Sequence, residues 1–186
     1  FPFTTLFRSN SAAPEPSAMA QVCLGNPSAS TKTIDAVNGT PYSDDTVIQN
    51  GDTITYRIFI NNAGPSNVTI NYICENASDN LTNITNLQVV GQGATNGGIT
   101  TNDPTCLSQG GTGVRFNVSG TKDLLHNWIL TFDGTLATTG EQGETVTNNA
   151  VIHYTDSEPR QKTVTAPNLL IQNGGAKVPI FREVAP

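Results

Sequence analysis

The chain has 186 residues and a formal net charge of −6 at pH 7, with 36% hydrophobic and only 13% charged residues. It contains no basic cluster, which argues against binding to nucleic acid or to an anionic membrane surface. No apolar run approaches the roughly 18 residues of a membrane span. The 26 threonines and 20 asparagines favour strands joined by turns. The composition therefore predicts an all-β domain whose polar surface is largely uncharged.

The length suits one domain of about 100–150 residues with flanking segments. Residues 1–9 resemble the translation of a sequencing adaptor, and residues 10–20 are rich in Ser, Ala and Pro. We expect residues 1–20 to be a disordered linker, although the small residues at 17–20 are also typical of a signal-cleavage site. We expect the domain to cover residues 21–172 and residues 173–186 to be a Gly-rich linker or tail.

In chain order, the first strand is predicted at residues 31–37, and the clearest strand signal follows at residues 51–62. Every even position from 54 to 60 is apolar, and this period of two indicates a strand with one buried face. Turn residues at 62–66 end the strand. The same alternation resumes at even positions from Val68 to Tyr72. We therefore expect these two segments to be neighbouring antiparallel strands.

The rest of the chain alternates in the same way between turn-rich stretches. Shorter strands are predicted at 47–48, 87–90, 113–118, 126–133, 145–154 and 161–171. Residues 76–86 and 91–112 are rich in Gly, Asn, Ser and Thr and are predicted to be loops, the second with at most one short strand. About eight strands without helical periodicity predict an immunoglobulin-like antiparallel β-sandwich with flexible N- and C-terminal tails.

The three cysteines follow no zinc-binding spacing. Cys74 ends a predicted strand and Cys106 lies in a predicted loop. We interpret these two as a disulfide, which implies an oxidising compartment. The alternative is a pair of unpaired thiols. Cys23 is left over, either unpaired or separated from a partner that this sequence does not contain.

Three segments together resemble the conserved repeat domain of bacterial and archaeal surface proteins known as DUF11. The matching residues are Lys-Thr-Ile at 32–34, Gly-Asp-Thr-Ile-Thr-Tyr at 51–56, Gly-Pro at 64–65, Asn-Val-Thr-Ile at 67–70 and Thr-Asn-Asn-Ala-Val-Ile-His-Tyr at 147–154. The resemblance covers about residues 30–171. It implies a stalk, filament or adhesin-type module on a cell surface, usually one of several in tandem.

A related group of Gram-positive pilin domains joins a first-strand lysine to a last-strand asparagine by an intramolecular isopeptide bond. Lys32 and Asn148 match these positions, and each is expected on the inward face of its strand. The reaction needs a neutral amine, an adjacent carboxamide and a buried carboxyl group. The family's acid falls at Tyr72 here, and Glu75 and Asp133 are the nearest substitutes. The alternative is that Lys32 extends along a sheet edge and Asn148 bonds to backbone.

We assign no catalytic, cofactor-binding or metal-binding residues. His126 and His153 are expected on the solvent-facing sides of strands, and no catalytic or phosphate-binding motif is present. Asp44, Asp45 and Asp103 lie in predicted turns, where a Ca²⁺ site is less expected than solvated carboxylates. Six glycosylation sequons occur, which in a secreted protein can carry glycans on surface loops; in a chain so rich in Asn and Thr, chance occurrence or sporadic use is favoured. They begin at Asn38, Asn67, Asn76, Asn80, Asn83 and Asn117.

Three classes of function were weighed against these residues. The favoured one is a non-enzymatic structural or adhesive module of a secreted or cell-surface protein, with other surface domains or an extracellular protein or glycan as partner. The alternative is a glycan- or protein-binding module that acts through residues 76–86 and 91–112. An enzyme would need a convergent carboxylate pair or a catalytic triad, and the sequence offers neither. No cofactor, nucleic acid or membrane span is expected.

Overall fold

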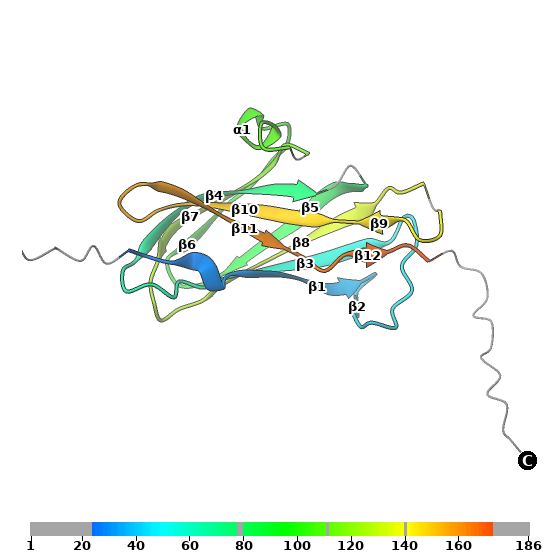
Figure 1. Ribbon diagram of the computed structural model, residues 1–186, viewed down its shortest axis with the longest axis horizontal. Helices are drawn as coiled ribbons and strands as arrows, with labels where there is room; N and C mark the ends of the chain where they lie inside the picture. The colour runs from blue at the N-terminus through cyan, green and yellow to red at the C-terminus, as the bar shows by residue number, and fades with distance from the viewer. Residues whose placement is uncertain (1–23, 78–79, 111, 140, 173–186) are drawn as a thin grey trace, which may run out of the picture.

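The computed structural model describes residues 24–77, 80–110, 112–139 and 141–172. These residues form a β-sandwich that is elongated along its strands, with the beginning and the end of the described chain at opposite ends (Figure 1). The expected linker at 1–20, Cys23 and the expected tail at 173–186 lie outside the described residues.

Two antiparallel sheets of five strands make up the sandwich. The first sheet has the order β2-β1-β3-β8-β5, and the second has the order β11-β10-β4-β7-β6. The strands of the first sheet are β1 (Thr31–Val37), β2 (Thr40–Pro41), β3 (Thr53–Ile60), β5 (Leu81–Val90) and β8 (Trp128–Leu136). Those of the second are β4 (Val68–Ala77), β6 (Ala94–Thr100), β7 (Val114–Lys122), β10 (Asn148–Thr155) and β11 (Pro159–Thr165).

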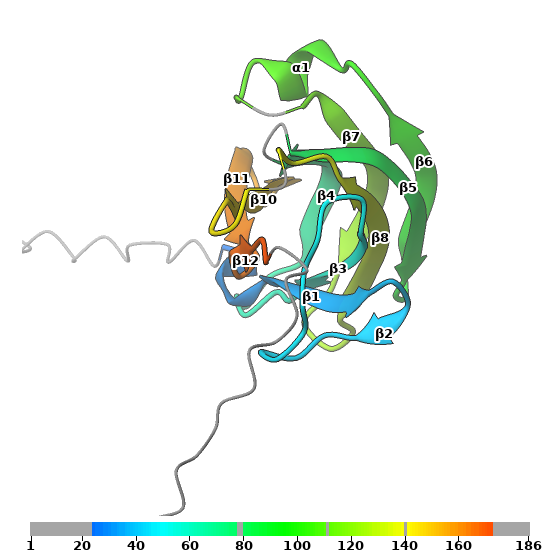
Figure 2. The ribbon, with the colours of Figure 1, turned by 90° about the vertical axis from the view of Figure 1, so that its right-hand side faces the viewer.

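Smaller elements complete the fold. The strands β9 (Thr145–Val146) and β12 (Leu169–Leu170) pair with each other. A short 3₁₀ turn, η1 (Pro27–Ala29), precedes β1, and a single helical turn, α1 (Pro104–Leu107), stands outside the sandwich (Figure 2). The sequence shows no helical periodicity and did not predict α1, because four residues are too few to carry such a pattern.

The alternating apolar residues of both sheets meet in one core. The even positions of β3 from Ile54 to Ile60 are at most 1% exposed. Trp128, Phe132 and Phe116 are fully buried, and the rings of Phe116 and Phe132 lie 4.8 Å apart across the interior. The expected all-β antiparallel sandwich is therefore confirmed, and the period-two pattern correctly identified the inward faces of β3, β7 and β8.

The expected pairing of the segments 54–60 and 68–72 is wrong. β3 pairs with β1 and β8, whereas β4 pairs with β10 and β7, so the two segments belong to opposite sheets. The turn between them carries the chain from one layer to the other. Alternation records that one face of a strand is buried, but it does not name the neighbouring strand.

The two predicted loops contain regular structure. Residues 76–86 include the end of β4 and the start of β5, and residues 91–112 include β6 and α1. In β5 the inward residues Leu81, Ile84 and Leu87 recur every third position, because Asn83 and Asn86 adopt positive φ angles of 48° and 55° and shift the strand register. Asparagine tolerates this conformation, so β5 is a bulged strand. Its Asn- and Thr-rich composition led to the prediction of a loop. No strand forms at 47–48.

Candidate functional site: a buried lysine, glutamate and asparagine

Three polar side chains meet between the two sheets. Lys32 comes from β1 in the first sheet, and Glu75 and Asn148 come from β4 and β10, which are neighbours in the second sheet. The Lys32 ammonium donates to Oε1 of Glu75 at 2.5 Å and to Oδ1 of Asn148 at 2.7 Å. Lys32 is 2% exposed, Glu75 0% and Asn148 1%. The alternative of a lysine at a sheet edge and an asparagine bonded to backbone is therefore wrong.

A shift of register in β4 turns Glu75 inward. Val68 and Ile70 face the core, but the pairing with β7 changes register between Ile70 and Ile73, and the buried positions then become Ile73 and Glu75. The expected continuation through Tyr72 fails at this irregularity. A strand that gains or loses one residue relative to its partner exposes the opposite set of side chains.

The other acid considered for this position lies elsewhere. Asp133 is on the outer side of β8, where it accepts hydrogen bonds from Thr55 Oγ1 and Asn86 Nδ2, both at 2.7 Å. Glu75 is therefore the carboxyl group beside Lys32 and Asn148. The sequence carries no clear signal for its burial, because Glu75 is followed directly by the polar Asn76 and precedes a turn-rich stretch.

Burial acts on both ionisable groups of the cluster. It lowers the pKa of Lys32 from 10.5 to about 8, against the opposing attraction of Glu75. Burial also raises the pKa of Glu75 above its usual 4.5, although Lys32 and Asn148 favour the charged carboxylate. The two shifts bring the amine and the acid closer in proton affinity. A neutral amine beside a neutral carboxylic acid thus becomes accessible without a change in the net charge of the pair.

Aromatic rings form the wall of the cluster on the side of the first sheet. The Lys32 nitrogen lies 5.2 Å from the ring centroids of Tyr56 and Phe132. These two rings stack on each other at 5.5 Å. The rings keep water away from the amine and stabilise its charged form by a cation–π contact.

Three buried polar atoms of this cluster have no hydrogen-bond partner: the Tyr56 hydroxyl, Oε2 of Glu75 and Nδ2 of Asn148. An unsatisfied buried donor or acceptor costs about 1–3 kcal/mol. Because all three atoms belong to the cluster around the Lys32 amine, this cluster contains more hydrogen-bond donors and acceptors than form hydrogen bonds in the structure.

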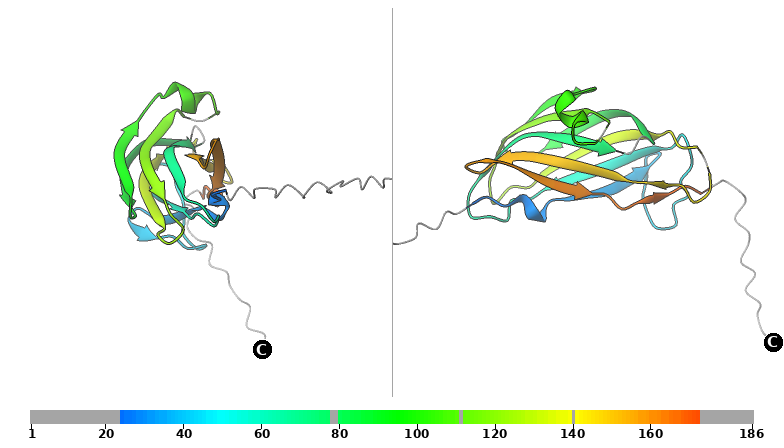
Figure 3. Two further views of the ribbon diagram at one scale, coloured as in Figure 1. Left: turned by 90° about the vertical axis from the view of Figure 1, so that its left-hand side faces the viewer. Right: turned by 45° about the horizontal axis from the view of Figure 1, so that its top comes forward.

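The disulfide lies on the opposite side of the same strand. Cys74, the residue before Glu75, is bonded to Cys106 of α1 on the outer face of the second sheet. Asp103 caps α1 by accepting from the backbone N–H groups of Thr105 and Cys106. The sulfur bridge therefore ties α1 to the sheet. Figure 3 shows the helical turn α1 outside the sandwich from two further sides.

A stack of polar aromatic groups lies beside the disulfide. The guanidinium of Arg115 lies 4.1 Å from the ring centroid of Tyr72, and this ring stacks on His153 at 4.2 Å. His153 is 7% exposed and its Nε2 hydrogen-bonds Gln109, which follows α1. The expectation that His153 faces solvent is wrong, because Tyr72 stacks on its ring and Gln109 hydrogen-bonds it on the outer face of β10. Burial lowers the pKa of His153, and the charge of Arg115 acts in the same direction.

The remaining candidate positions are occupied by local structural contacts. His126 is exposed and pairs with Asp123 at 2.7 Å. Asp103 caps α1, and Asp44 and Asp45 are exposed residues of a loop. Among the described residues, no three His, Cys, Asp or Glu side chains gather as metal ligands would. No helix in those residues reaches the length and apolarity that a bilayer crossing requires.

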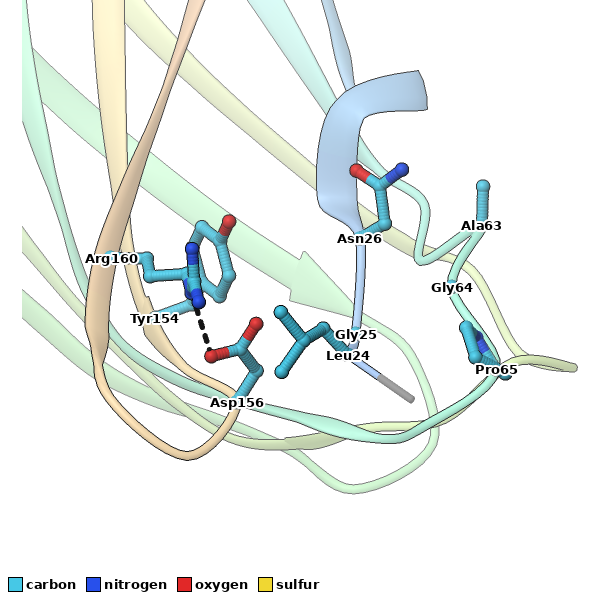
Figure 4. Close-up of a pocket in the computed structure, with 9 residues that line it drawn as sticks. All are labelled: Leu24, Gly25, Asn26, Ala63, Gly64, Pro65, Tyr154, Asp156 and Arg160. Atoms are coloured by element: carbon cyan, nitrogen blue, oxygen red, sulfur yellow. Dashed lines mark hydrogen bonds and ion pairs between the residues drawn. The ribbon is translucent and has the colours of Figure 1, made fainter. Parts of the chain in front are cut away.

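The described residues border surface hollows, two of which lie near segments already considered. One, of about 420 Å³, is bordered by residues 24–26, by the turn at 63–65 and by the hairpin that carries Tyr154, Asp156 and Arg160 (Figure 4). The ion pair between Asp156 and Arg160, with a distance of 2.8 Å, forms one of its walls. The other, of about 360 Å³, lies between residues 81–84 and Thr101, Thr112 and Val114. The two segments weighed as a binding surface thus meet at an uncharged pocket.

Comparison with known proteins gives structural neighbours only. Neither the family models nor the curated proteins contain a match to the chain. Among solved structures, the chain resembles the pilus backbone protein RrgB of Streptococcus pneumoniae with 16% identity and a TM-score of 0.43, covering 69% of this chain and 53% of that one.

Two further solved structures show a similar level of likeness. Domains D2 and D3 of the major pilin SpaD of Corynebacterium diphtheriae match with 15% identity and a TM-score of 0.40, over 76% of this chain and 51% of that one. The collagen-binding subdomain of the Enterococcus faecalis surface protein ACE matches with 12% identity and a TM-score of 0.38, over 77% and 96%. The chain thus spans about half the length of the two pilins. Similarity at this level assigns no function.

Proposed function

We propose that this chain is a non-enzymatic structural module of a secreted or cell-surface protein, and that a covalent bond between Lys32 and Asn148 joins its two sheets. The observation that carries the proposal is the position of the Lys32 amine, 2.5 Å from Glu75 and 2.7 Å from Asn148 inside a water-excluded core. No substrate from outside takes part, because every reacting group belongs to the chain.

The reaction is an amide exchange within the folded domain. Glu75 takes a proton from the Lys32 ammonium, and the neutral Nζ attacks Cγ of Asn148. The Nζ–Cγ bond forms, the Cγ–Nδ2 bond breaks and ammonia leaves. The second proton lost by Nζ passes through Glu75 to Nδ2, so Glu75 returns to its protonated form. Burial supports each transfer, since it favours the neutral amine and the neutral acid.

The location of the bond supports a mechanical role. Lys32 and Asn148 are 116 residues apart and lie in different sheets. A bond between them holds the two layers together after hydrogen bonds have broken, which suits a module that bears tension. The disulfide between Cys74 and Cys106 and the low charged fraction favour an oxidising, extracellular setting. We also propose that the partner of this module is a protein or a glycan at the cell surface.

Intact mass spectrometry of the reduced and denatured full chain tests the proposal. The wild-type protein is expected to be lighter than its sequence mass by one ammonia, and proteolysis is expected to release a branched peptide containing Lys32 and Asn148. Asn148→Ala and Lys32→Met are expected to keep their sequence masses. Lys162→Met is the matched control and should still lose ammonia. A wild-type chain at its full sequence mass would sink the proposal.

A further inference from the structure

The Tyr56 hydroxyl is a buried donor without a use in the resting domain. Tyr56 is 1% exposed, and its hydroxyl makes no hydrogen bond. Its ring is fixed by the stack on Phe132. Phenylalanine would supply the same ring without burying an unsatisfied group. Packing therefore does not explain why this position carries a hydroxyl group.

The neighbours of the hydroxyl are the reacting groups of the proposed bond. Burial raises the pKa of Tyr56, the adjacent Asn148 side chain lowers it and the charge of Glu75 raises it, so both groups lie near the hydroxyl. The unpartnered atoms Nδ2 of Asn148 and Oε2 of Glu75 belong to the same cluster. Two unsatisfied atoms, the Tyr56 hydroxyl and Oε2 of Glu75, thus belong to the same cluster as the carboxamide whose carbon is the site of attack.

The resting hydrogen bonds cannot all persist during the reaction. At rest, the Lys32 ammonium donates to Oδ1 of Asn148. When Nζ loses its proton and bonds to Cγ, this donor is gone at the moment when negative charge develops on Oδ1. A tetrahedral intermediate in a water-excluded core needs a donor at that oxygen.

We infer that Tyr56 is a catalytic residue of the Lys32–Asn148 reaction, whose hydroxyl donates a hydrogen bond to Oδ1 of Asn148 as the oxyanion forms. This inference rests on the proposed function. It also gives the other two unpartnered atoms a role. Oε2 of Glu75 accepts a proton from the Lys32 nitrogen, and Nδ2 of Asn148 receives the proton that releases ammonia.

Tyr56→Phe tests the inference, because it removes the hydroxyl and keeps the ring. The full chain is synthesised in a cell-free system, samples are quenched in acid at intervals, and the fraction that has lost ammonia is measured by intact mass. Bond formation in Tyr56→Phe is expected to slow on the order of 100-fold, the loss typical of a missing oxyanion donor. Tyr154→Phe is the matched control, since Tyr154 also faces inward but is six residues along β10 from Asn148.

A second measurement separates catalysis from packing. In the Asn148→Ala background, where no bond forms, Tyr56→Phe is expected to leave the urea midpoint unchanged or to raise it. A slow reaction together with undiminished stability supports the inference. Equal rates in Tyr56→Phe and wild type overturn it while leaving the proposed function intact. A wild-type chain that never loses ammonia overturns both.

Discussion

Two neighbouring residues of β4 serve opposite faces of the second sheet. Cys74 points outward and binds α1 through a disulfide, whereas Glu75 points inward and binds Lys32 of the first sheet. The outer link joins residues 32 positions apart in the sequence, through a bond that reduction breaks. In the inner cluster, a hydrogen bond joins Lys32 to Asn148, 116 residues further along the chain, and the cluster is buried away from solvent and reductant.

The difference shows how burial changes the chemistry of a strand. On the outer face, an arginine, a tyrosine and a histidine stack with partial access to solvent. On the inner face, an ammonium and a carboxylate meet without water, where their charges are expensive to maintain. In the proposed function the inner cluster reacts to form a neutral amide, whereas the outer link is a disulfide that reduction can break.

Removal of the inner acid is expected to have the largest effect. Glu75→Ala leaves the Lys32 amine buried without its partner, which costs about 3–5 kcal/mol in comparable pairs, and it also prevents the covalent bond. Urea unfolding and intact mass measure both effects. Glu158→Ala, at an exposed glutamate, is the control. A loss of stability below about 1 kcal/mol would contradict a buried pair.

Removal of the outer link is expected to rank second. The double change Cys74→Ala and Cys106→Ala releases a 32-residue loop, for which chain entropy predicts a loss of about 3–4 kcal/mol. Thermal unfolding without reductant measures this change, and Cys23→Ser is the control for altering a cysteine. The ammonia loss should persist in the double variant. If it disappeared, the inner and outer links would not be independent.

The pH dependence of an unlinked variant sharpens the contrast further. In Asn148→Ala, Glu75 keeps a folded pKa above 4.5, so the folded state binds more protons and stability falls as pH rises above 4.5. Lys32 has a folded pKa of about 8 against 10.5 unfolded, so stability rises again between those values. Urea midpoints from pH 4 to 10 should therefore pass through a minimum. A monotonic curve would show that the pair does not control this dependence.

The smallest effect is expected from the stack beside the disulfide. Arg115→Gln removes the cation above Tyr72, a contact worth about 0.5–1 kcal/mol when partly exposed. Differential scanning calorimetry measures the shift, with Arg57→Gln as control at an exposed ion pair. A loss as large as that of the disulfide variant would mean that the stack, rather than the sulfur bridge, secures α1.

The sequence alone was sufficient for the general architecture. Period-two alternation identified the long strands and the inward residues of β3, β7 and β8, because burial of one face leaves a direct record in residue polarity. The first strand at 31–37 agrees with β1, and Cys74 and Cys106 were paired by context. Lys32 and Asn148 were singled out through a resemblance, and their side chains do lie in contact.

Only the tertiary structure decided which acid joins them. A register shift in β4 turns Glu75 inward and Tyr72 outward, and nothing in local polarity marks that shift. Contacts between distant segments likewise decide the partner sheets of β3 and β4, the bulged course of β5 and the burial of His153 against Tyr72 and Gln109. Alternation reports the burial of each strand separately, whereas register and pairing are properties of two strands together.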